Sequence, residues 1–185
     1  NRVWNDSNGD GIQNPGEPSL SGVTLELFLD ANNDGVPDGA AIGTVTTDVN
    51  GNYTFSSATG TDASGVDFGV SIVANQNYII RVAASDWTGG TGAGDLAGFK
   101  LSPTDNLGNG ATDFSDNDAG LTIGASPVPQ IRFTTGFAGA NNHNLDLGFN
   151  NLASLGDKVW LDNGTGGGTA ANGVQDGTEP GIANV

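Results

Sequence analysis

Apolar and polar residues alternate with a period of two in two stretches of the chain. Aliphatic residues hold every second position from 23 to 29, and a similar alternation recurs at 145–149. Because successive side chains of a β-strand point to opposite faces, each stretch predicts a strand with one apolar face. Short β-branched or aromatic runs bounded by turn residues predict further strands at 42–47, 53–56, 68–73, 78–83 and 130–134.

No segment carries a sustained helical period, and turn signals are frequent. The chain has 31 glycines among its 185 residues, which disfavours long helices. The pair Asn50-Gly51 predicts a tight hairpin turn. Together these signals predict an all-β fold, a Greek-key-like β-sandwich with about seven or more short strands. The stretch 86–129 holds only brief apolar pieces, so we expect a long functional or ligand-ordered loop there.

The stretch 6–17, DSNGDGIQNPGE, matches the pattern D-x-[DN]-x-[DN]-G-x5-E of a calcium loop at every specified position. Calcium takes about six to eight oxygen ligands, so a short loop must turn alternate side chains inward and close with a bidentate carboxylate. Asp, Asn and Gly also favour turns, and the alternative is an acidic surface loop without metal. The predicted ligands are Asp6, Asn8, Asp10, the carbonyl of Ile12, and Glu17.

EF-hand proteins place such a loop between two helices, which the flanking sequence does not favour here. Pro15 and Pro18 flank Glu17, where an outgoing helix would need free N–H groups. The following run, 23–29, alternates like a strand. The loop is therefore predicted to lie between strands, so the sandwich should have long calcium-binding loops.

Two further stretches place oxygen-bearing side chains at short spacing. The second loop begins at Asp30 and lacks a glutamate at its twelfth position. The third candidate lies within 105–118, where three carboxylates so close together would repel one another without a cation. A plain hairpin loop and an exposed acidic loop are the respective alternatives. The predicted ligands are Asp30, Asn32, Asp34, Val36 and Asp38 in the second loop, and Asp113, Asp116 and Asp118 in the third.

The opening motif recurs near the end of the chain. Residues 3–6 (VWND) return at 159–162 (VWLD), and residues 11–18 return at 173–180 after an insertion. The sequence therefore predicts one complete repeat at 1–151, followed at 152–185 by a linker and the start of the next repeat. The second copy keeps Asp162, Asn172 and Glu179 as counterparts of the first-loop ligands at positions one, five and twelve. Because Asn172 replaces a carboxylate, weaker calcium binding is expected there.

The charge balance narrows the possible partners. With 21 Asp and Glu against five Lys and Arg, the formal net charge is −16, which disfavours binding to nucleic acid or to an anionic membrane. Divalent cations would relieve the repulsion, and we expect a looser fold without metal. The chain has no cysteine and no methionine. No disulfide can hold the fold, metal could substitute for one, and the chain looks like an excerpt of a longer polypeptide.

Candidate catalytic groups are few, so we predict that the chain is not an enzyme. His143 is the sole histidine, and its parity with the 145–149 run favours a place at a strand end near the core. No serine or threonine lies in a nucleophile-elbow context. A different class remains as an alternative function: a calcium-dependent carbohydrate- or ligand-binding module that uses an exposed Trp87.

The motifs resemble a known family. GDKVWLD at 156–162, NGVQDGTEPG at 172–181 and TDVNGNYTF at 47–55 are similar to segments of the SdrD B-like domain, the calcium-binding B-type repeat of serine-aspartate surface adhesins. The resemblance covers residues 1 to about 60 and the final 30 or so.

The resemblance implies an extracellular, cell-surface β-sandwich of the Ig-like or Cna-B-like kind with two or three bound Ca²⁺ ions. Such a module serves as a rigid stalk or spacer in adhesins or filaments. Its expected partners are neighbouring repeats of the same polypeptide and, in a fibre, other subunits. It implies no direct membrane insertion by this segment.

Overall fold

A computed structural model of the chain describes residues 1–88, 91–104, 115–151 and 159–182. Contacts divide the chain into two compact units, Asn1–Leu152 and Ala153–Val185. All the strands among the described residues lie in the larger unit, and the described part of the smaller one consists of turns with one isolated bridge between Trp160 and Gly181. The described residues include no helix with the length and apolar character needed to cross a bilayer.

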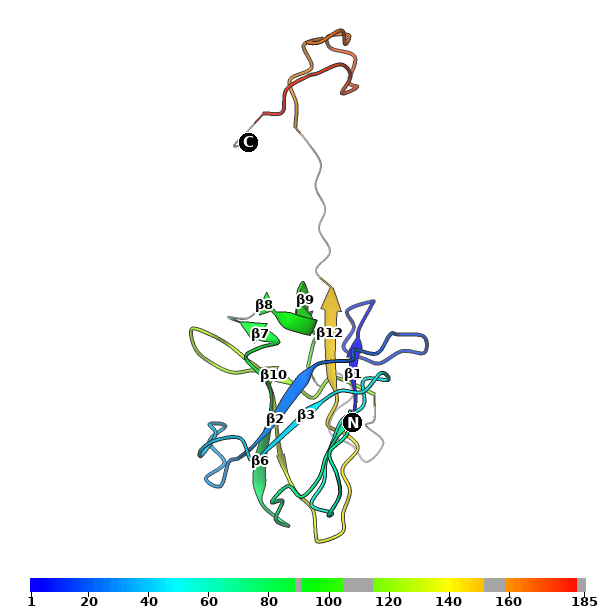
Figure 1. Cartoon of the computed structure of the whole chain (residues 1–185). Coiled ribbons are helices and arrows are strands. Elements are labelled where there is room, and N and C mark those ends of the chain that lie inside the picture. The colour runs from blue at the N-terminus through cyan, green and yellow to red at the C-terminus, as the bar shows by residue number, and fades with distance from the viewer. Residues whose placement is uncertain (89–90, 105–114, 152–158, 183–185) are drawn as a thin grey trace. The chain divides into compact units, whose positions relative to one another are not determined.

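The larger unit is built from short strands and one turn of 3-10 helix (Figure 1). The elements, in chain order, are β1 (Val3–Asn5), β2 (Thr24–Leu29), β3 (Gly43–Thr46), β4 (Thr54–Phe55), β5 (Val66–Asp67), β6 (Asn77–Val82), β7 (Trp87–Thr88), β8 (Thr91–Gly92), η1 (Gly94–Leu96), β9 (Phe99–Leu101), β10 (Gly120–Leu121), β11 (Pro129–Thr134) and β12 (Leu147–Asn151).

One sheet has five antiparallel strands in the order β10-β11-β6-β2-β3. Its central strands β2 and β6 pair from Leu25 opposite Val82 to Leu29 opposite Tyr78. The alternation predicted for β2 is present, since Leu25 and Leu27 are almost fully buried while Glu26 is only partly buried. The apolar row therefore faces the core and fixes the register of this sheet.

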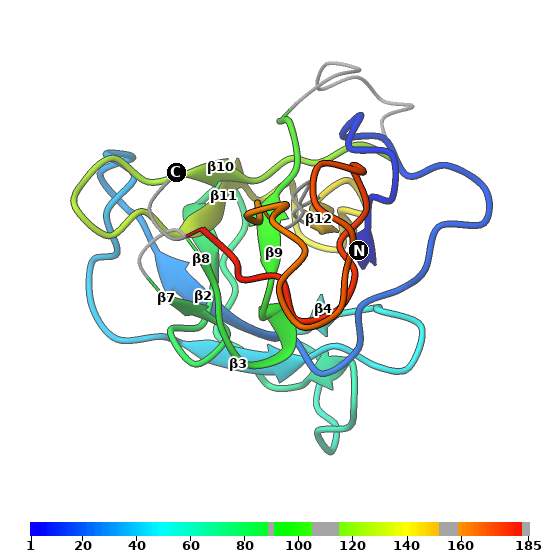
Figure 2. The same cartoon turned by 90° about the horizontal axis from the view of Figure 1, so that it is seen from above.

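The second sheet has three strands in the order β1-β12-β9. β1 runs parallel to β12, with Val3 opposite Leu147 and Asn5 opposite Phe149, so the beginning and the end of the unit lie side by side (Figures 1 and 2). The indole of Trp4 lies directly over Gly148, where an added Cβ would come within 2.6 Å of the ring. Glycine at this position therefore allows Trp4 to be fully buried.

Side chains of both sheets share one core. The buried cluster joins Val3, Leu147 and Phe149 of the three-stranded sheet with Leu25, Ile80 and Ile131 of the other. The prediction of an all-β sandwich is thus confirmed.

Three local predictions were wrong. Residues 68–73 form no strand, because Gly69 has a positive φ of 72° and Ile72 bonds back to the carbonyl of Val70, which bends the chain away from a ladder. The short β5 just before them pairs instead, in parallel, with β4. The Asn50-Gly51 turn is present, but β3 and β4 lie in different sheets and do not form a ladder with each other. The stretch 86–129 was also expected to be irregular, yet its described parts include four short strands.

Tyr53 ties the Asn50-Gly51 turn to the segment just before β12, and it gives a prediction at alkaline pH. Its buried hydroxyl donates to the carbonyl of Leu145, and burial, with nearby Asp146 and Asp118, raises the pKa of Tyr53 well above its usual range. A raised pKa of an acid gives stability that is present below the unfolded pKa of about 10 and is lost as the pH rises beyond it. Tyr53→Phe should cost about 1–3 kcal/mol at neutral pH, because the carbonyl loses its donor. The substitution should also reduce the loss of unfolding free energy above about pH 10. Urea melts of both proteins at several pH values from 8 to 11 test this, and an equal loss of unfolding free energy with pH in both proteins would contradict it.

Candidate metal centre

The first acidic loop, residues 6–17, connects β1 of one sheet to β2 of the other and is organised by one buried carboxylate. Asp6 is fully buried. Its Oδ1 accepts the N–H groups of Gly9 and Asp10 at 2.8 and 3.2 Å, and its Oδ2 accepts that of Gly11 at 2.9 Å. No lysine or arginine side chain lies within ion-pair distance of Asp6 in the described parts of the chain. The sequence thus folds around a negative charge that only backbone dipoles compensate.

Two further side-chain oxygens of the first loop each accept the N–H group of the residue two places later in the sequence. Asn8 Oδ1 accepts the Asp10 N–H at 3.0 Å, and Asp10 Oδ1 accepts the Ile12 N–H at 2.8 Å. That bond from Ile12 is the main cause that holds the pKa of Asp10 below its usual value. Asp10 is therefore ionised at neutral pH, as a cation ligand must be.

The second loop connects β2 to β3 and repeats these bonds at the same positions. Asp30 is buried, and its carboxylate accepts the N–H groups of Asp34 and Gly35 at 3.0 and 3.1 Å. Asn32 Oδ1 accepts from Asp34, and Asp34 Oδ1 accepts from Val36 at 2.8 Å. The two loops lie on opposite sides of the larger unit (Figures 1 and 2).

The loop at 162–179 is a third copy. Asp162 Oδ2 accepts the Gly173 N–H at 2.8 Å, and Asn172 Oδ1 accepts the Val174 N–H at 2.7 Å. These bonds match those of Asp6 with Gly11 and of Asp10 with Ile12. The insertion before Asn172 therefore leaves the second half of the loop unchanged.

All three loops also share a backbone signature, two left-handed residues separated by one. The pairs are Gly9 and Gly11, Asn33 and Gly35, and Ala171 and Gly173, with φ between 58° and 81°. Left-handed residues turn successive N–H groups inward, which is why one carboxylate can accept several of them.

A carboxylate closes each loop by binding the N–H group near its start. Glu17 accepts from Ser7 at 2.8 Å and Glu179 accepts from Gly164 at 2.7 Å. In the second loop Asp38, at position nine, accepts the Ala31 N–H at 2.6 Å. Asp38 thus does for the second loop what Glu17 does for the first, which explains how that loop manages without a glutamate at position twelve.

The donor set fits a hard cation such as Ca²⁺. Each loop offers carboxylate, amide and carbonyl oxygens, the ligands that calcium prefers. Among the described residues no three acidic or histidine side chains converge as a cluster, so amide and carbonyl oxygens would have to supply part of any ligand set. In the loop at 162–179 the buried Asp162 Oδ1 has no hydrogen-bond partner, an arrangement that a bound cation would relieve.

The third stretch predicted from sequence is placed against the first loop. Asp113 lies outside the described residues. Asp116 is buried and forms an isolated bridge with Ile12, and Asn117 N–H donates to the Gly11 carbonyl at 2.9 Å. Asp118 accepts the Asp146 N–H at 2.6 Å. The segment 115–118 therefore supports the carbonyl side of the first loop, a placement that local spacing did not reveal.

Two residues that the sequence analysis missed touch the loops. Asn14, at position nine of the first loop, donates from Nδ2 to the Asp10 carboxylate at 3.0 Å and to the Ile12 carbonyl at 3.1 Å. Asn14 could have been predicted from the sequence, because position nine is also a ligand position of such loops. Arg132 of β11 lies 3.7 Å from Asp30 and donates to the Asn33 carbonyl at 2.6 Å. No local signal links Arg132 to a loop that precedes it by about 100 residues.

Arg132 places a fixed positive charge 3.7 Å from the opening aspartate of the second loop, which leads to a prediction. Arg132→Gln should lower the stability of the metal-free protein by roughly 1 kcal/mol, because the buried Asp30 loses its counter-charge. The same change should enlarge the rise in melting temperature on adding calcium, since repulsion of the ion is removed. Lys100→Gln is the matched control, because it also removes one positive charge and Lys100 is an exposed residue of β9, in the other sheet. An equal calcium response in both variants would contradict the prediction.

Two other expectations from the sequence were wrong. Trp87 is 2% exposed, and its indole N–H donates to the Pro127 carbonyl at 2.9 Å. The ring packs against Phe149 at 5.8 Å between centroids, so it belongs to the core and offers no surface to a sugar. His143 is exposed, because the strand it was expected to begin starts only at Leu147.

The fold and the loops define a class of protein: an all-β module whose strands are joined by EF-hand-like acidic loops and whose opening motif is repeated. Residues 1–92 match the family model of the SdrD B-like domain. Three curated relatives align with 99% of the chain: serine-aspartate repeat-containing protein F of Staphylococcus epidermidis (strain ATCC 12228 / FDA PCI 1200) at 31% identity, and proteins E (strain USA300) and D (strain Newman) of Staphylococcus aureus at 32% and 31%. The chain spans 8–11% of the length of these relatives.

Through residues 1–92 the chain belongs to the SdrD B-like domain family, as the resemblance of its motifs indicated. The family match extends past residue 60 to residue 92, whereas the final 30 or so residues, on which the resemblance also rested, lie outside it.

Proposed function

We propose that this chain is a calcium-stiffened structural repeat, a stalk or spacer, of an extracellular cell-surface adhesin or filament. The observation that carries the proposal is the threefold recurrence of one loop plan, in which each copy opens on an aspartate whose carboxylate accepts the N–H group of Gly11, Gly35 or Gly173. The relatives' names describe repeat-containing proteins of which this chain matches a small share, which fits a module rather than an enzyme.

Calcium would act on the first two loops as a cross-link between strands. Asp6, Asn8, Asp10, the Ile12 carbonyl and Glu17 would hold one ion, and Asp30, Asn32, Asp34, the Val36 carbonyl and Asp38 a second. An ion whose dissociation constant lies about 100-fold below its ambient concentration stabilises the folded state by about 2.7 kcal/mol. This is comparable to a disulfide, which the chain lacks.

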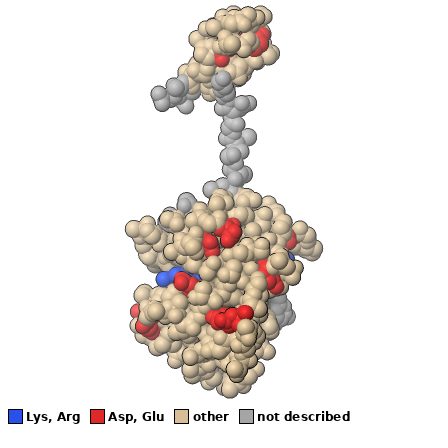
Figure 3. Space-filling view, in the orientation of Figure 1, with Lys and Arg blue, Asp and Glu red and all other residues tan. Residues whose placement is uncertain are grey.

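The surface charge supports the same conclusion. The net charge is −16, and the visible face of the larger unit carries several separate acidic groups with little basic surface (Figure 3). Each bound Ca²⁺ would remove two negative charges from this excess, so the compact state should gain from calcium beyond the local ligand bonds.

The first loop is also tied to the strand by which the chain leaves the larger unit. The Asp6 N–H donates to the Phe149 carbonyl of β12 at 2.8 Å. Ordering the first loop would therefore stiffen the carboxyl-terminal end of the unit, which is where a following repeat would be attached.

The test compares the whole chain in calcium and in EDTA. We expect EDTA to lower the melting temperature and to increase the radius of gyration in small-angle scattering, because the loops loosen and the acidic groups repel. Magnesium at the same ionic strength is the control, since it demands a tighter octahedral geometry. If melting and scattering are the same in calcium and EDTA, the chain is not calcium-stiffened.

A further inference from the structure

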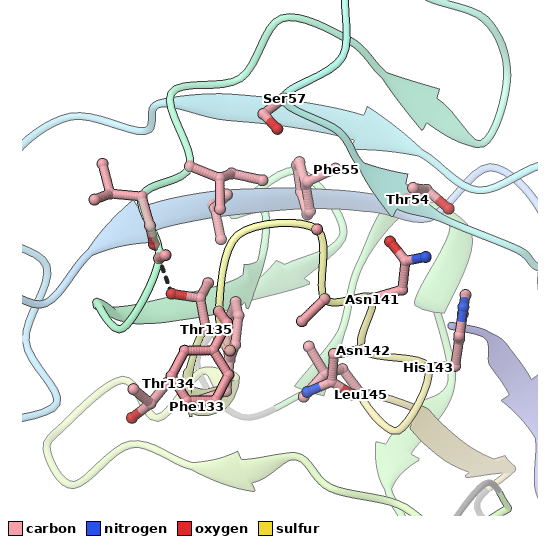
Figure 4. A pocket seen from close by; sticks show the side chains of 18 of the residues that line it. Thr54, Phe55, Ser57, Phe133, Thr134, Thr135, Asn141, Asn142, His143 and Leu145 are labelled. Atoms are coloured by element: carbon pink, nitrogen blue, oxygen red, sulfur yellow. Dashed lines mark hydrogen bonds between the residues drawn. The ribbon is translucent and has the colours of Figure 1, made fainter.

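A cavity of about 550 Å³ opens beside the amino end of β1. Its walls come from β4, from β11 and from the connection between β11 and β12, and Figure 4 shows Thr54 and Phe55 on one side with Asn142, His143 and Leu145 on another. Leu27 and Ile80, two residues of the apolar core, also line it. The cavity therefore gives access to the core of the sandwich, with polar groups around its mouth.

Asn1 lines this cavity and is held between two chain segments. On one side its carbonyl accepts the Tyr53 N–H at 3.0 Å, and Arg2 forms an antiparallel bridge with Asn52. On the other side its Oδ1 accepts the Leu145 N–H at 3.3 Å, next to the parallel pairing of β1 with β12. The segment that contains Tyr53 and the segment that contains Leu145 both continue past Asn1 along the cavity wall.

The registers on the two sides identify what a longer β1 would meet. Antiparallel pairing that puts Arg2 opposite Asn52 puts a residue two places before Asn1 opposite Phe55. Parallel pairing that puts Val3 opposite Leu147 puts the same residue beside His143. Phe55 and His143 both line the cavity. That residue would share the parity of the fully buried Val3, so its side chain would point to the core and enter the cavity.

The internal repeat says which residue type belongs there. Val159 is the counterpart of Val3, so Asp157 corresponds to Asn1 and Leu155 to the residue two places before it. A leucine opposite a phenylalanine is a favourable cross-strand pair, and it would cover the apolar floor formed by Leu27 and Ile80.

We propose that the cavity is a socket for a leucine on a strand segment that continues β1 at its amino end, supplied by the connection from another copy of this repeat with the sequence of residues 153–156, Ala-Ser-Leu-Gly. The leucine would fill the socket while its backbone lies between residues 53–55 and 143–145. One repeat would thus contribute a core residue to the next and lock the junction between them. This partner rests on the proposed function as a tandem module, but the socket itself requires no calcium.

The test extends the whole chain by Ala-Ser-Leu-Gly ahead of Asn1 and compares it with an extension in which serine replaces that leucine. We expect the leucine form to melt roughly 5 °C higher than the serine form in both calcium and EDTA. Nuclear Overhauser contacts should join the leucine methyl groups to the Phe55 ring. In a Phe55→Ala background the difference between the two extensions should shrink to less than half.

Equal melting of the leucine and serine extensions, or leucine methyl groups without contacts to Phe55, would overturn the proposal and leave the cavity to a separate ligand. Because both extensions are compared at the same calcium concentration, loss of the calcium effect alone would count against the proposed function without touching the socket.

Discussion

Glu17→Gln should remove most of the stabilisation that calcium gives to the first loop. Glutamine can still accept the Ser7 N–H that Glu17 accepts at 2.8 Å, but it offers neither the negative charge nor the second carboxylate oxygen that now accepts from Asn14. A bidentate carboxylate is the closing ligand of such loops. We expect the rise in melting temperature on adding calcium to shrink by about 5–10 °C, which corresponds to about 2.7 kcal/mol in a chain of this size.

Asp48→Asn is the matched control for this experiment. Asp48 Oδ1 also caps a turn, accepting the Asn50 and Asn52 N–H groups at 2.8 Å each, but its turn lacks the loop pattern and is explained by Asn50-Gly51 alone. The substitution should lower stability by a similar small amount in calcium and in EDTA. A Glu17→Gln protein that keeps the full calcium response, measured by differential scanning calorimetry beside this control, would show that the first loop is only a turn.

Gly51→Ala should be among the most destabilising single changes in the larger unit. Gly51 has a φ of 74°, and an added Cβ would lie 2.3 Å from the Val3 carbonyl oxygen. That carbonyl also accepts the Leu20 N–H, and the Gly51 carbonyl accepts from Val3. The strain of a left-handed alanine and the backbone clash together should cost about 3 kcal/mol, or roughly 6–12 °C in melting temperature.

Gly69→Ala separates the strain from the clash. Gly69 has nearly the same φ, 72°, but an added Cβ would meet no atom within 4 Å. This variant should lose only about 1–2 kcal/mol. If the two alanine variants lose the same amount of melting temperature in EDTA, then the close approach of the turn to β1 does not matter for stability.

Local patterns predicted what depends on neighbouring residues. The period-two row of β2 gave the buried face of the five-stranded sheet, because burial of one face leaves a direct trace in the sequence. The prolines beside Glu17 and the alternation at 23–29 likewise predicted that the first loop lies between strands. The shared left-handed residues at Gly9 and Gly11 follow from the spacing of Asp, Asn and Gly in that loop.

Long-range partners left no such trace. β1 pairs in parallel with β12 although Val3 and Leu147 lie far apart in sequence, and no period within either strand encodes a partner. The same holds for the segment at Asp116 against Ile12 and for Arg132 over Asp30. Trp87 was misjudged for a related reason: its glycine-rich surroundings suggested exposure, while its burial against Phe149 depends on a strand about 60 residues away.

The first and second loops share one motif but are closed by different carboxylates. Asp38 closes the second loop from position nine, where Glu17 closes the first from position twelve. Among the loops that the structure describes, the second is also the one with an arginine within ion-pair distance of its opening aspartate. We therefore expect the two sites to differ in calcium affinity, with the first loop the tighter one, since no described lysine or arginine lies within ion-pair distance of Asp6.

The most direct test of the central claim is the number of calcium ions that the whole chain binds. Equilibrium dialysis of the metal-free protein against labelled calcium, at physiological ionic strength, should give two or three ions per complete repeat, with one ion lost in Glu17→Gln and none in Asp48→Asn. No retained calcium at millimolar free concentration, or retention that Glu17→Gln leaves unchanged, would contradict the account.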